Sequence, residues 1–216
     1  MARLRKAGRV WRDATARADA ERILIGDAAA SALTIDLPAL FPSKALLEVE
    51  LGAGRGDFIM ARAMACPDRN FLAVELAASV ARVFAARAGR RGLNNLRIIR
   101  ADARTLVNLL LPDGSVGVYH IYFPDPWPKA RHEKHRMVSP SMVAALARTL
   151  ATAGLIHVAS DVEPWARQMF SMLTAGGFSE SPAEVPGARF SGFGRKYLAA
   201  GRPIFASSFR RPDLTE

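Results

Sequence analysis

The hydrophobic positions of this chain form short β-rich runs that alternate with stretches of helical spacing. Apolar runs of strand length are predicted as five strands, at residues 45–51, 70–75, 96–101, 118–123 and 154–160. Helices are predicted between them at residues 57–66, 79–89, 139–150 and 163–175, with Asp57 as the cap of the first. Two further strands are expected between residues 189 and 210. This alternation predicts an α/β fold, with a doubly wound, mainly parallel, seven-stranded sheet and helices on both faces.

Basic residues outnumber acidic ones in this chain, 30 to 20, which gives a net charge of +10. Such an excess favours a polyanionic partner, nucleic acid first and an anionic membrane surface second. Basic residues are frequent in the first 22 positions, namely Arg3, Arg5, Lys6, Arg9, Arg12, Arg17 and Arg22. Residues 1–40 are therefore predicted to form a basic arm and linker ahead of one domain at residues 41–216.

The chain is expected to be a soluble cytoplasmic protein. No apolar run approaches the roughly 18 residues of a membrane-spanning helix. The single cysteine, Cys66, excludes an internal disulfide, which fits a reducing compartment. His132 and His135 lie close together in the sequence, but no cysteine or third ligand accompanies them, so we expect no metal site.

A glycine-rich turn follows the first predicted strand. Gly52, Gly54 and Gly56 precede a helix, so the backbone can approach a ligand closely, and we predict cofactor contacts at Gly52 and Gly54. Glu75 ends the next strand, where an acid suits the hydroxyls of a ribose, as in a nicotinamide dinucleotide site. The GxGxG spacing and Glu50 argue against that cofactor, because a carboxylate repels a pyrophosphate. They favour S-adenosylmethionine, which carries a sulfonium and an ammonium and no phosphate.

Acidic residues stand at the ends of four successive predicted strands, namely Glu50, Glu75, Asp102 and Asp125. In a parallel sheet these ends share one edge, and ligands bind there. Asp102 is placed to accept the adenine amino group of the cofactor. A single acid at a strand end is usually a turn residue or a helix cap, but four acids beside a glycine loop predict a binding site.

The fourth acid lies in a proline-rich loop, Pro124-Asp125-Pro126-Trp127-Pro128, which ends the strand at residues 118–123. Three prolines fix φ repeatedly and remove backbone donors, so the loop is expected to be stiff. Trp127 either stacks on a base or wedges the loop, and we favour the wedge. Four basic residues follow, namely Lys129, Arg131, Lys134 and Arg136. An acidic side chain on a stiff loop, beside an aromatic ring and a run of basic residues, suits the binding of a flat base that belongs to a polyanion.

Five segments of the sequence together resemble one known family. They are ExGxGxG at Glu50–Gly56, FLAVE at Phe71–Glu75, GLNNLRIIRADA at Gly92–Ala103, FPDPWPKxRHxKxR at Phe123–Arg136 and SDxEP at Ser160–Pro164. In this order and spacing, over residues 40–211, they resemble the bacterial tRNA (guanine-N7)-methyltransferases. The glycine loop marks class I methyltransferases at large, whereas the proline-rich string is specific. The resemblance implies a Rossmann-like class I methyltransferase domain at residues 41–216, which transfers a methyl group from S-adenosylmethionine to N7 of the variable-loop guanine of tRNA.

The resemblance also implies roles for individual residues. The cofactor contacts of the family fall on Glu50, Glu75, Asp102 and Asp125, and Asp125 also falls on its catalytic residue. The tRNA contacts of the family fall on Lys129 and Asp161. A further substrate segment, T-(K/R)-(F/Y)-E, aligns with Ser191-Gly192-Phe193-Gly194. Ser191 keeps the hydroxyl and the ring is kept, but Gly192 and Gly194 replace the basic residue and the glutamate, which puts the contacts of this segment in doubt.

The expected chemistry follows from guanine N7, which has a free lone pair and no proton to remove. The reaction needs no strong general base at this atom, and much of the rate can come from placing N7 in line with the sulfonium methyl group. Methylation leaves the base cationic, so the Asp125 carboxylate would stabilise the charge that develops. Asp125 and Asp161 are also candidates to accept from the guanine N1–H and amino group, which would select guanine over adenine.

Three other interpretations stay open. The first is another class I methyltransferase that acts on an RNA or protein nitrogen, although an exocyclic-amine enzyme is expected to carry an Asn/Asp-Pro-Pro-aromatic loop, an order absent from residues 125–128. Gly192 and Gly194 also allow a non-catalytic tRNA-binding relative. A dinucleotide oxidoreductase is disfavoured by Glu50 and the GxGxG spacing. The oligomeric state stays open between monomer and homodimer.

Overall fold

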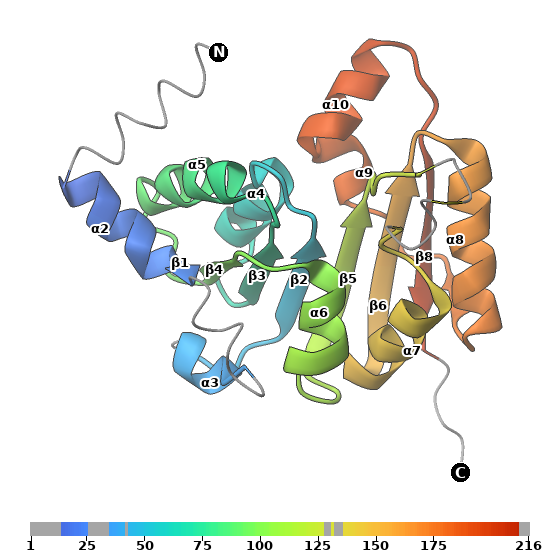
Figure 1. Cartoon of the computed structure of the whole chain (residues 1–216), viewed down its shortest axis with the longest axis horizontal. Helices are drawn as coiled ribbons and strands as arrows, with labels where there is room; N and C mark the ends of the chain where they lie inside the picture. Colours follow the sequence, from blue (N-terminus) through green and yellow to red (C-terminus); the bar gives the residue numbers. More distant parts are fainter. Residues whose placement is uncertain (1–13, 26–34, 42, 128–130, 132–135, 212–216) are drawn as a thin grey trace.

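The computed structural model describes residues 14–25, 35–41, 43–127, 131 and 136–211, and an eight-stranded sheet forms its centre (Figure 1). The strands are β1 (Leu24–Ile25), β2 (Leu47–Leu51), β3 (Asn70–Val74), β4 (Leu96–Ile99), β5 (Val116–Tyr122), β6 (Leu150–Ser160), β7 (Ser179–Ser181) and β8 (Phe205–Arg210). Their order in the sheet is β1-β4-β3-β2-β5-β6-β8-β7. Strands β1 to β6 pair in parallel, and β8 is antiparallel to both β6 and β7. The predicted doubly wound, mainly parallel sheet is confirmed.

Helices cover both faces of this sheet (Figure 1). They are α2 (Ala14–Ile23), α3 (Leu37–Leu40), α4 (Asp57–Ala65), α5 (Ala78–Gly89), α6 (Ala103–Thr105), α7 (Pro140–Thr149), α8 (Glu163–Ala175), α9 (Gly187–Phe190) and α10 (Gly192–Ala199), and the π-helical stretch η2 (Leu106–Leu110) continues α6. Helices α2, α4 and α5 bury their apolar side chains in one core, and η2, α7 and α8 bury theirs in a second core. The described part of the chain has no helix long and apolar enough to cross a membrane.

The two cores lie on opposite faces of the sheet. In β3, Phe71 and Ala73 belong to the core beneath α4 and α5, while Leu72 and Val74 belong to the other core. All five residues of β3 are buried, because side chains that point to either face of a parallel sheet meet a helix layer. This double burial is the reason that the predicted strands appear as continuous apolar runs.

The direction in which strands are added reverses between β2 and β5. Strand β2 pairs with β3 on one side and with β5 on the other, so the chain moves outward through β3 and β4 and then returns to the centre. In open α/β sheets, ligands bind outside the carboxyl ends of the strands at such a switch point. The glycine loop after β2 and the proline-rich loop after β5 both lie there.

Several local predictions are corrected by the structure. Asp57 is not the cap of α4, because Gly56 is the N-cap in a left-handed conformation and makes no side-chain bond. The tail forms α9, α10 and one strand, β8, in place of two strands. Ser191 accepts a hydrogen bond from the Gly194 N–H and so caps α10, and this local cap starts a helix where strands were expected. The unpredicted strands β1 and β7 are short, at two and three residues, and give no clear period.

The segment predicted as an arm and linker falls partly within the described residues. Helix α2 packs on α5, and β1 pairs with β4 at the edge of the sheet. Arg22 on α2 also donates to Asn94 Oδ1 at 2.5 Å. Residues 1–13 and 26–34 lie outside the described part of the chain, and the predicted domain boundary near residue 40 stays a prediction.

Gly56 provides a test of the packing behind the glycine loop. Its φ is +69°, and a Cβ built on it would lie 2.1 Å from Cε2 of the fully buried Phe84 ring. We expect Gly56→Ala to lower the free energy of unfolding by about 2–4 kcal/mol, from overpacking and backbone strain together. Denaturant unfolding measures this loss.

Gly114→Ala is the matched control for that variant. Gly114 has a similar φ, +59°, but a Cβ there would meet no atom within 4 Å. Only the backbone strain, about 1 kcal/mol, is expected for it. Equal losses in the two variants would contradict the packing explanation.

Candidate active site

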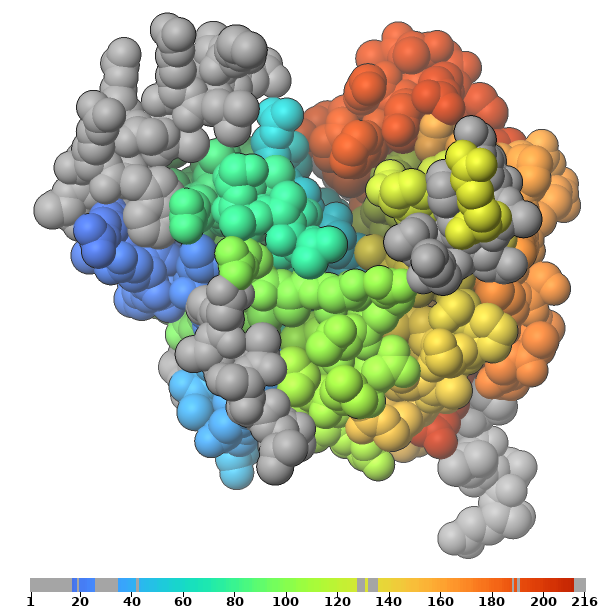
Figure 2. All heavy atoms as spheres, viewed as in Figure 1, coloured from blue at the N-terminus to red at the C-terminus, as the bar shows by residue number. Residues whose placement is uncertain are grey.

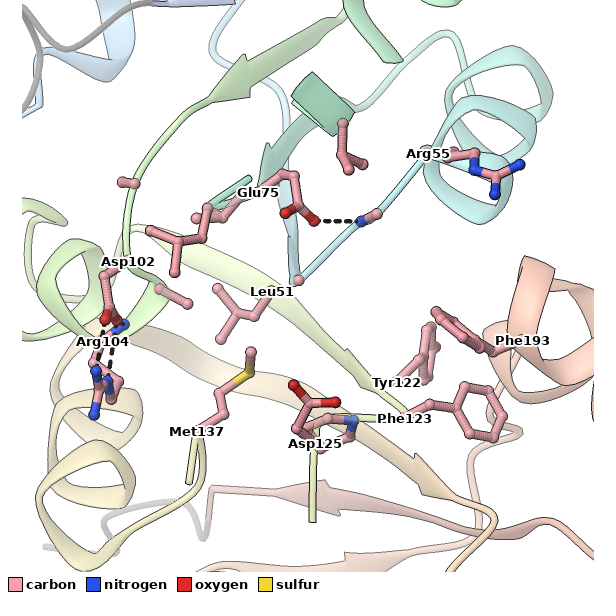
Figure 3. A pocket seen from close by; sticks show the side chains of 18 of the residues that line it. Leu51, Arg55, Glu75, Asp102, Arg104, Tyr122, Phe123, Asp125, Met137 and Phe193 are labelled. Carbon is pink, nitrogen blue, oxygen red and sulfur yellow. Dashed lines mark hydrogen bonds and ion pairs between the residues drawn. The ribbon is translucent and has the colours of Figure 1, made fainter. Parts of the chain in front are cut away.

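A cavity of about 580 Å³ opens at the carboxyl ends of β2 to β5. Its wall contains both predicted loop glycines and three of the predicted acids, namely Gly52, Gly54, Glu75, Asp102 and Asp125. Phe193 of α10 forms another part of the wall (Figure 3). On the molecular surface, the hollow lies between α5 and α10 (Figure 2). Three of the four acids predicted to share one sheet edge therefore line a single cavity, and Glu50 does not.

Glu75 connects the glycine loop to the start of α5. Its Oε2 accepts from the Gly54 N–H at 2.9 Å, drawn as a dashed line in Figure 3, and its Oε1 accepts from the Ala77 N–H at 2.8 Å. The second bond satisfies a backbone donor at a helix N-terminus. Each carboxylate oxygen has a further lone pair, so Glu75 can still accept from the hydroxyls of a ribose.

Asp102 is the N-cap of α6 and accepts from the Arg104 N–H at 2.8 Å. The Arg104 guanidinium also donates to it, with Nη2 at 2.6 Å from Oδ2 (Figure 3). These side-chain hydrogen bonds lower the pKa of Asp102, because they favour its ionised form. An ionised acceptor on the cavity wall suits an amino group such as that of adenine.

Glu50 lies within β2 and is only 4% exposed. Its Oε2 has no hydrogen-bond partner among the described residues. Burial raises the pKa of Glu50 well above its usual value, and the nearby carboxylates of Asp57 and Glu75 add to the rise. A buried polar atom without a partner is unfavourable, and a ligand that brings a donor or a positive charge would satisfy this atom and favour the ionised form of Glu50. Its contact with a cofactor stays a prediction.

The loop that carries Asp125 has an unusual backbone. Phe123 has a φ of +54° and Trp127 a φ of +40°, a region that residues other than glycine seldom adopt. Arg136 holds the loop from outside, with Nε donating to the Pro126 carbonyl at 3.2 Å and Nη2 to the Trp127 carbonyl at 3.3 Å. Asp125 is exposed, and its carboxylate is directed into the cavity (Figure 3). The loop thus ends β5 as predicted and presents its acid to the cavity.

Trp127 lines the same cavity and is 36% exposed. Whether its ring stacks on a base or wedges the loop stays a prediction. Lys129, Lys134 and the histidines at 132 and 135 lie outside the described residues. In the part of the chain that is described, no group of three or more His, Cys, Asp or Glu side chains could hold a metal ion.

The other predicted substrate residues lie outside the cavity wall. Ser191 Oγ accepts from the Gly194 N–H at 2.9 Å, and both residues are buried. Asp161 follows β6 and forms an ion pair with Arg202. These groups are therefore engaged within the chain, and their contact with a substrate stays a prediction.

Asp57 ties α10 to the glycine loop. Arg195 Nη2 lies 3.7 Å from Asp57 Oδ2, and Arg87 Nη2 donates to Oδ1 at 2.6 Å. A Cβ on Gly192 would lie 2.7 Å from the same Oδ2, so a side chain at this position requires Asp57 to shift. Gly192, which departs from the family pattern, thus allows the start of α10 to approach the Asp57 carboxylate closely. Arg195, one turn later on α10, places its guanidinium near the same carboxylate.

Buried polar side chains cross the sheet on the face covered by α4. Glu50, His120, His157 and Ser208 are neighbours in register on β2, β5, β6 and β8. The two histidine rings stack with centroids 5.3 Å apart, and His157 Nδ1 lies 2.7 Å from Ser208 Oγ. Both histidines are buried, so they are packed within the sheet.

Glu48, also on β2, contacts His120 in this row of buried polar side chains. Its Oε2 lies 2.9 Å from His120 Nε2 and accepts from Arg62 Nε at 2.9 Å, and its Oε1 accepts from Arg69 Nη1 at 2.6 Å. Burial raises the pKa of Glu48, but the hydrogen bonds from His120 and Arg62 outweigh it, so the net shift is downward. Glu48 is therefore ionised in the interior of the sheet.

The ionised carboxylate fixes the direction of a chain of hydrogen bonds. Glu48 can only accept, so the neutral His120 ring carries its proton on Nε2 and leaves Nδ1 as an acceptor. The Tyr122 hydroxyl, 2.8 Å from Nδ1, donates to it and accepts from the Gly187 N–H at 3.2 Å. A Cβ on Gly187 would lie 1.8 Å from the Tyr122 ring. The end of β5 is thus locked between β2 and α9.

Sequence reasoning missed several wall residues. Arg55 and Leu76 line the cavity beside the glycine loop and Glu75, and their position next to motif residues was a usable signal. Met137 reaches the cavity from the segment before α7, and Tyr122 from the end of β5. These two residues flank the proline-rich motif at Phe123–Arg136, but whether their side chains reach the cavity depends on how distant segments pack.

The chain is similar to a known family over most of its length. A family described as "Putative methyltransferase" matches residues 44–204. A protein named tRNA (guanine-N(7)-)-methyltransferase from Leifsonia xyli subsp. xyli is 42% identical over 187 residues, which cover 82% of this chain and 81% of that protein. Proteins of the same name from Paracidovorax citrulli and Methylococcus capsulatus are 37% and 34% identical, with 82% and 83% of this chain and 73% and 81% of their own lengths covered.

Solved structures of low sequence identity share the fold. The 16S rRNA methyltransferase KamB has a TM-score of 0.60 at 17% identity, over 82% of this chain and 94% of its own. A 16S rRNA (adenine(1408)-N(1))-methyltransferase from Catenulisporales acidiphilia, solved with its cosubstrate SAM, has a TM-score of 0.58 at 15% identity, over 80% of this chain and 89% of its own. At these identities the similarity supports the arrangement of sheet and helices alone.

The buried histidines make the stability of the chain depend on pH. Burial lowers the pKa of His157 from 6.5 to about 3, so between these values the unfolded chain binds a proton that the folded chain does not. Stability therefore falls as the pH falls below 6.5. We expect His157 alone to lower the free energy of unfolding by about 2 kcal/mol between pH 7.5 and pH 5.

His157→Gln isolates this contribution, because glutamine can still hydrogen-bond but does not titrate. Denaturant unfolding at pH 7.5 and pH 5 should show a smaller pH-dependent loss for the variant than for the unsubstituted chain, whatever their stabilities at pH 7.5. The same loss in both proteins would rule out His157 as the titrating group.

Proposed function

The chain belongs to the family of tRNA (guanine-N(7)-)-methyltransferases, and we propose that it transfers the methyl group of S-adenosylmethionine to N7 of the variable-loop guanine of tRNA. The observation that carries the proposal is the cavity at the switch point of the sheet. It brings the glycine loop, Glu75 and Asp102 together with Asp125 and Phe193. A cofactor side and a substrate side thus meet in one space.

The residues around the cavity fit S-adenosylmethionine. Glu75 would accept from its ribose hydroxyls and Asp102 from its adenine amino group, while Glu50, which is not part of the cavity wall, has a buried Oε2 without a partner among the described residues. A Cβ on Gly54 would meet no atom within 4 Å, so this glycine leaves open space on the wall for a ligand. When bound, the cofactor supplies a methyl group activated by a sulfonium.

Asp125 is the residue we assign to catalysis. Guanine N7 presents a lone pair and carries no proton, so the protein does not have to supply a base at that atom. The Asp125 carboxylate would stabilise the positive charge that spreads over the guanine as N7 is methylated. The bonds from Arg136 to the Pro126 and Trp127 carbonyls hold the backbone of the loop that carries this carboxylate.

The tRNA contacts are assigned to Lys129, Asp161 and the segment Ser191–Gly194, and the activity is assigned to the cytoplasm. Basic side chains are also exposed near the cavity. Arg55 lines it, and Arg195 and Lys196 lie on α10 beside Phe193. A positively charged rim would hold the phosphates that surround a guanine placed in the cavity.

The proposal is tested by methyl transfer from labelled S-adenosylmethionine to unmodified tRNA, followed by borohydride and aniline, which cleave the chain at 7-methylguanine. One cut in the variable loop is the expected result. Incorporation of label without a cut would favour a methyltransferase that acts on another RNA nitrogen. Binding of tRNA without any incorporation would favour a non-catalytic relative.

Asp125→Asn tests the catalytic assignment with little change in volume. We expect kcat to fall by about 100-fold or more, because the charge that stabilises the methylated base is removed. The dissociation constant for S-adenosylmethionine, measured by calorimetry, should change by a few-fold at most. Asp68→Asn, an exposed acid outside the cavity wall, is the matched control and should keep full activity. Normal turnover in Asp125→Asn would exclude the assigned role.

Binding of tRNA should weaken steeply with salt. If four phosphates are neutralised, affinity should fall by about 100-fold between 50 and 200 mM salt, because bound counterions are released. Arg55→Gln should reduce the slope of log affinity against log salt by about 1. Arg167→Gln on α8, which also removes an exposed arginine, should leave it unchanged. A flat profile for the unsubstituted protein would mean that its net charge serves another purpose.

A further inference from the structure

Arg202 is fixed at the end of α10 by its backbone. Gly201 has a φ of +65° and reverses the chain after the helix. The Gly201 N–H donates to the Leu198 carbonyl at 3.0 Å, and the Arg202 N–H donates to the Tyr197 carbonyl at 2.9 Å. This pair of bonds is a Schellman ending. The guanidinium of Arg202 folds back over the Tyr197 ring, with Cζ 4.5 Å from the ring centroid.

The same guanidinium forms an ion pair with Asp161, the first residue after β6. The Asp161 side chain is only 10% exposed, and a carboxylate with so little solvent requires a charged or hydrogen-bonding partner. Arginine can pair with a carboxylate and stack on a ring at the same time because its charge is spread over a planar group, whereas lysine carries a compact charge. Arg202 thus joins the end of β6 to α10.

Tyr197 packs between Arg202 and the aromatic side chains of the cavity wall. Its ring lies 6.0 Å from that of Phe193, at an interplanar angle of 27°, and 5.3 Å from that of Phe123, at 64°. Phe193 is 52% exposed and lines the cavity beside Phe123 (Figure 3). Arg202, Tyr197 and Phe193 therefore form a column of flat groups with Asp161 at one end and the cavity at the other.

The charges around Tyr197 agree with this geometry. Burial raises the pKa of Tyr197, the Asp161 and Asp125 carboxylates raise it further, and Arg202 opposes them. Tyr197 therefore lies within electrostatic reach of both acids that are candidates to contact guanine.

We propose that Arg202 and Tyr197 are positioning residues for recognition of the target guanine, an inference that rests on the proposed function. Arg202 holds the Asp161 carboxylate in place to accept from the 2-amino group and N1–H of the base. Tyr197 holds the Phe193 ring, on which the base stacks. Neither residue touches the reacting atoms, and their effect is on selectivity and substrate affinity.

The test compares tRNA that carries guanine at the target position with tRNA that carries hypoxanthine there, assembled by ligation of two halves. Hypoxanthine keeps N7 but lacks the 2-amino group. A hydrogen bond to a carboxylate predicts that the unsubstituted enzyme prefers guanine in kcat/KM by about 10- to 100-fold. Arg202→Ala should reduce this preference to a few-fold, and Arg202→Lys should restore part of it. The dissociation constant for S-adenosylmethionine should stay within twofold throughout.

A double-mutant cycle shows whether Arg202 acts through Asp161. Asp161→Asn should also remove the preference, and adding Arg202→Ala to it should cause little further loss. Arg167→Ala breaks another arginine–carboxylate pair, with Glu163 on α8, and should leave the preference intact. The role of Arg202 would be overturned if the two substitutions lowered the preference for guanine additively. It would also be overturned if Arg202→Ala kept the full preference for guanine over hypoxanthine.

Tyr197 is tested with two variants in the same assay. Tyr197→Phe keeps the ring and should have a normal KM for tRNA. Tyr197→Ala removes the support for Phe193 and should raise that KM by about tenfold or more, since stacking of a base on an aromatic ring has about this value. A normal KM in Tyr197→Ala would overturn the role of Tyr197.

The two proposals fail in different ways. An unsubstituted protein that does not methylate guanine N7 in tRNA overturns the proposed function and this inference together. An active protein whose variants keep their discrimination and KM overturns the inference alone.

Discussion

The structure depends on the compensation of one buried charge. Glu48 is ionised in the middle of β2 with no exposed surface, and it is stabilised by Arg62, Arg69 and His120. An unpaired carboxylate in this position would cost several kcal/mol, so the loss of these partners would destabilise the fold. They belong to α4, to the segment before β3 and to β5. The interaction thus fixes the central strands against the helix that follows the glycine loop.

The site follows from that fixed centre. Because β2 and β5 are neighbours in register, the glycine loop and the Asp125 loop open into the same space. The hydrogen-bond chain from Glu48 through His120 to Tyr122 ends on Gly187 and so connects this centre to α9. The elements that hold the cavity are packed in the sheet, while the groups that would meet ligands lie on loops after the strands.

Helix α10 closes the substrate side of the cavity and is held at both ends. Arg195 faces Asp57 beside the glycine loop, and Arg202 pairs with Asp161 after β6. Of the two glycines that depart from the family pattern, Gly192 has a structural explanation in this helix, whereas the backbone N–H of Gly194 makes a bond that most other residues could make. Gly192 leaves room for Asp57, and Gly194 is the buried donor that Ser191 caps. The exposed ring of Phe193 is presented to the cavity by the same turn of helix.

The sequence by itself determined the class of fold, the positions of the five central strands along the chain and the candidate residues at their ends. It could do so because strands buried on both faces are continuous apolar runs, and because glycine and proline end them for local steric reasons. Only the tertiary structure decided which acids line the cavity and which are engaged elsewhere. Glu50 is buried with its Oε2 unpartnered among the described residues, and Asp161 pairs with Arg202, since burial and partners depend on segments far apart in the chain. Helix α10, where the sequence predicted strands, begins at a local cap of Ser191 on the Gly194 N–H and is held by the distant partners Asp57 and Asp161.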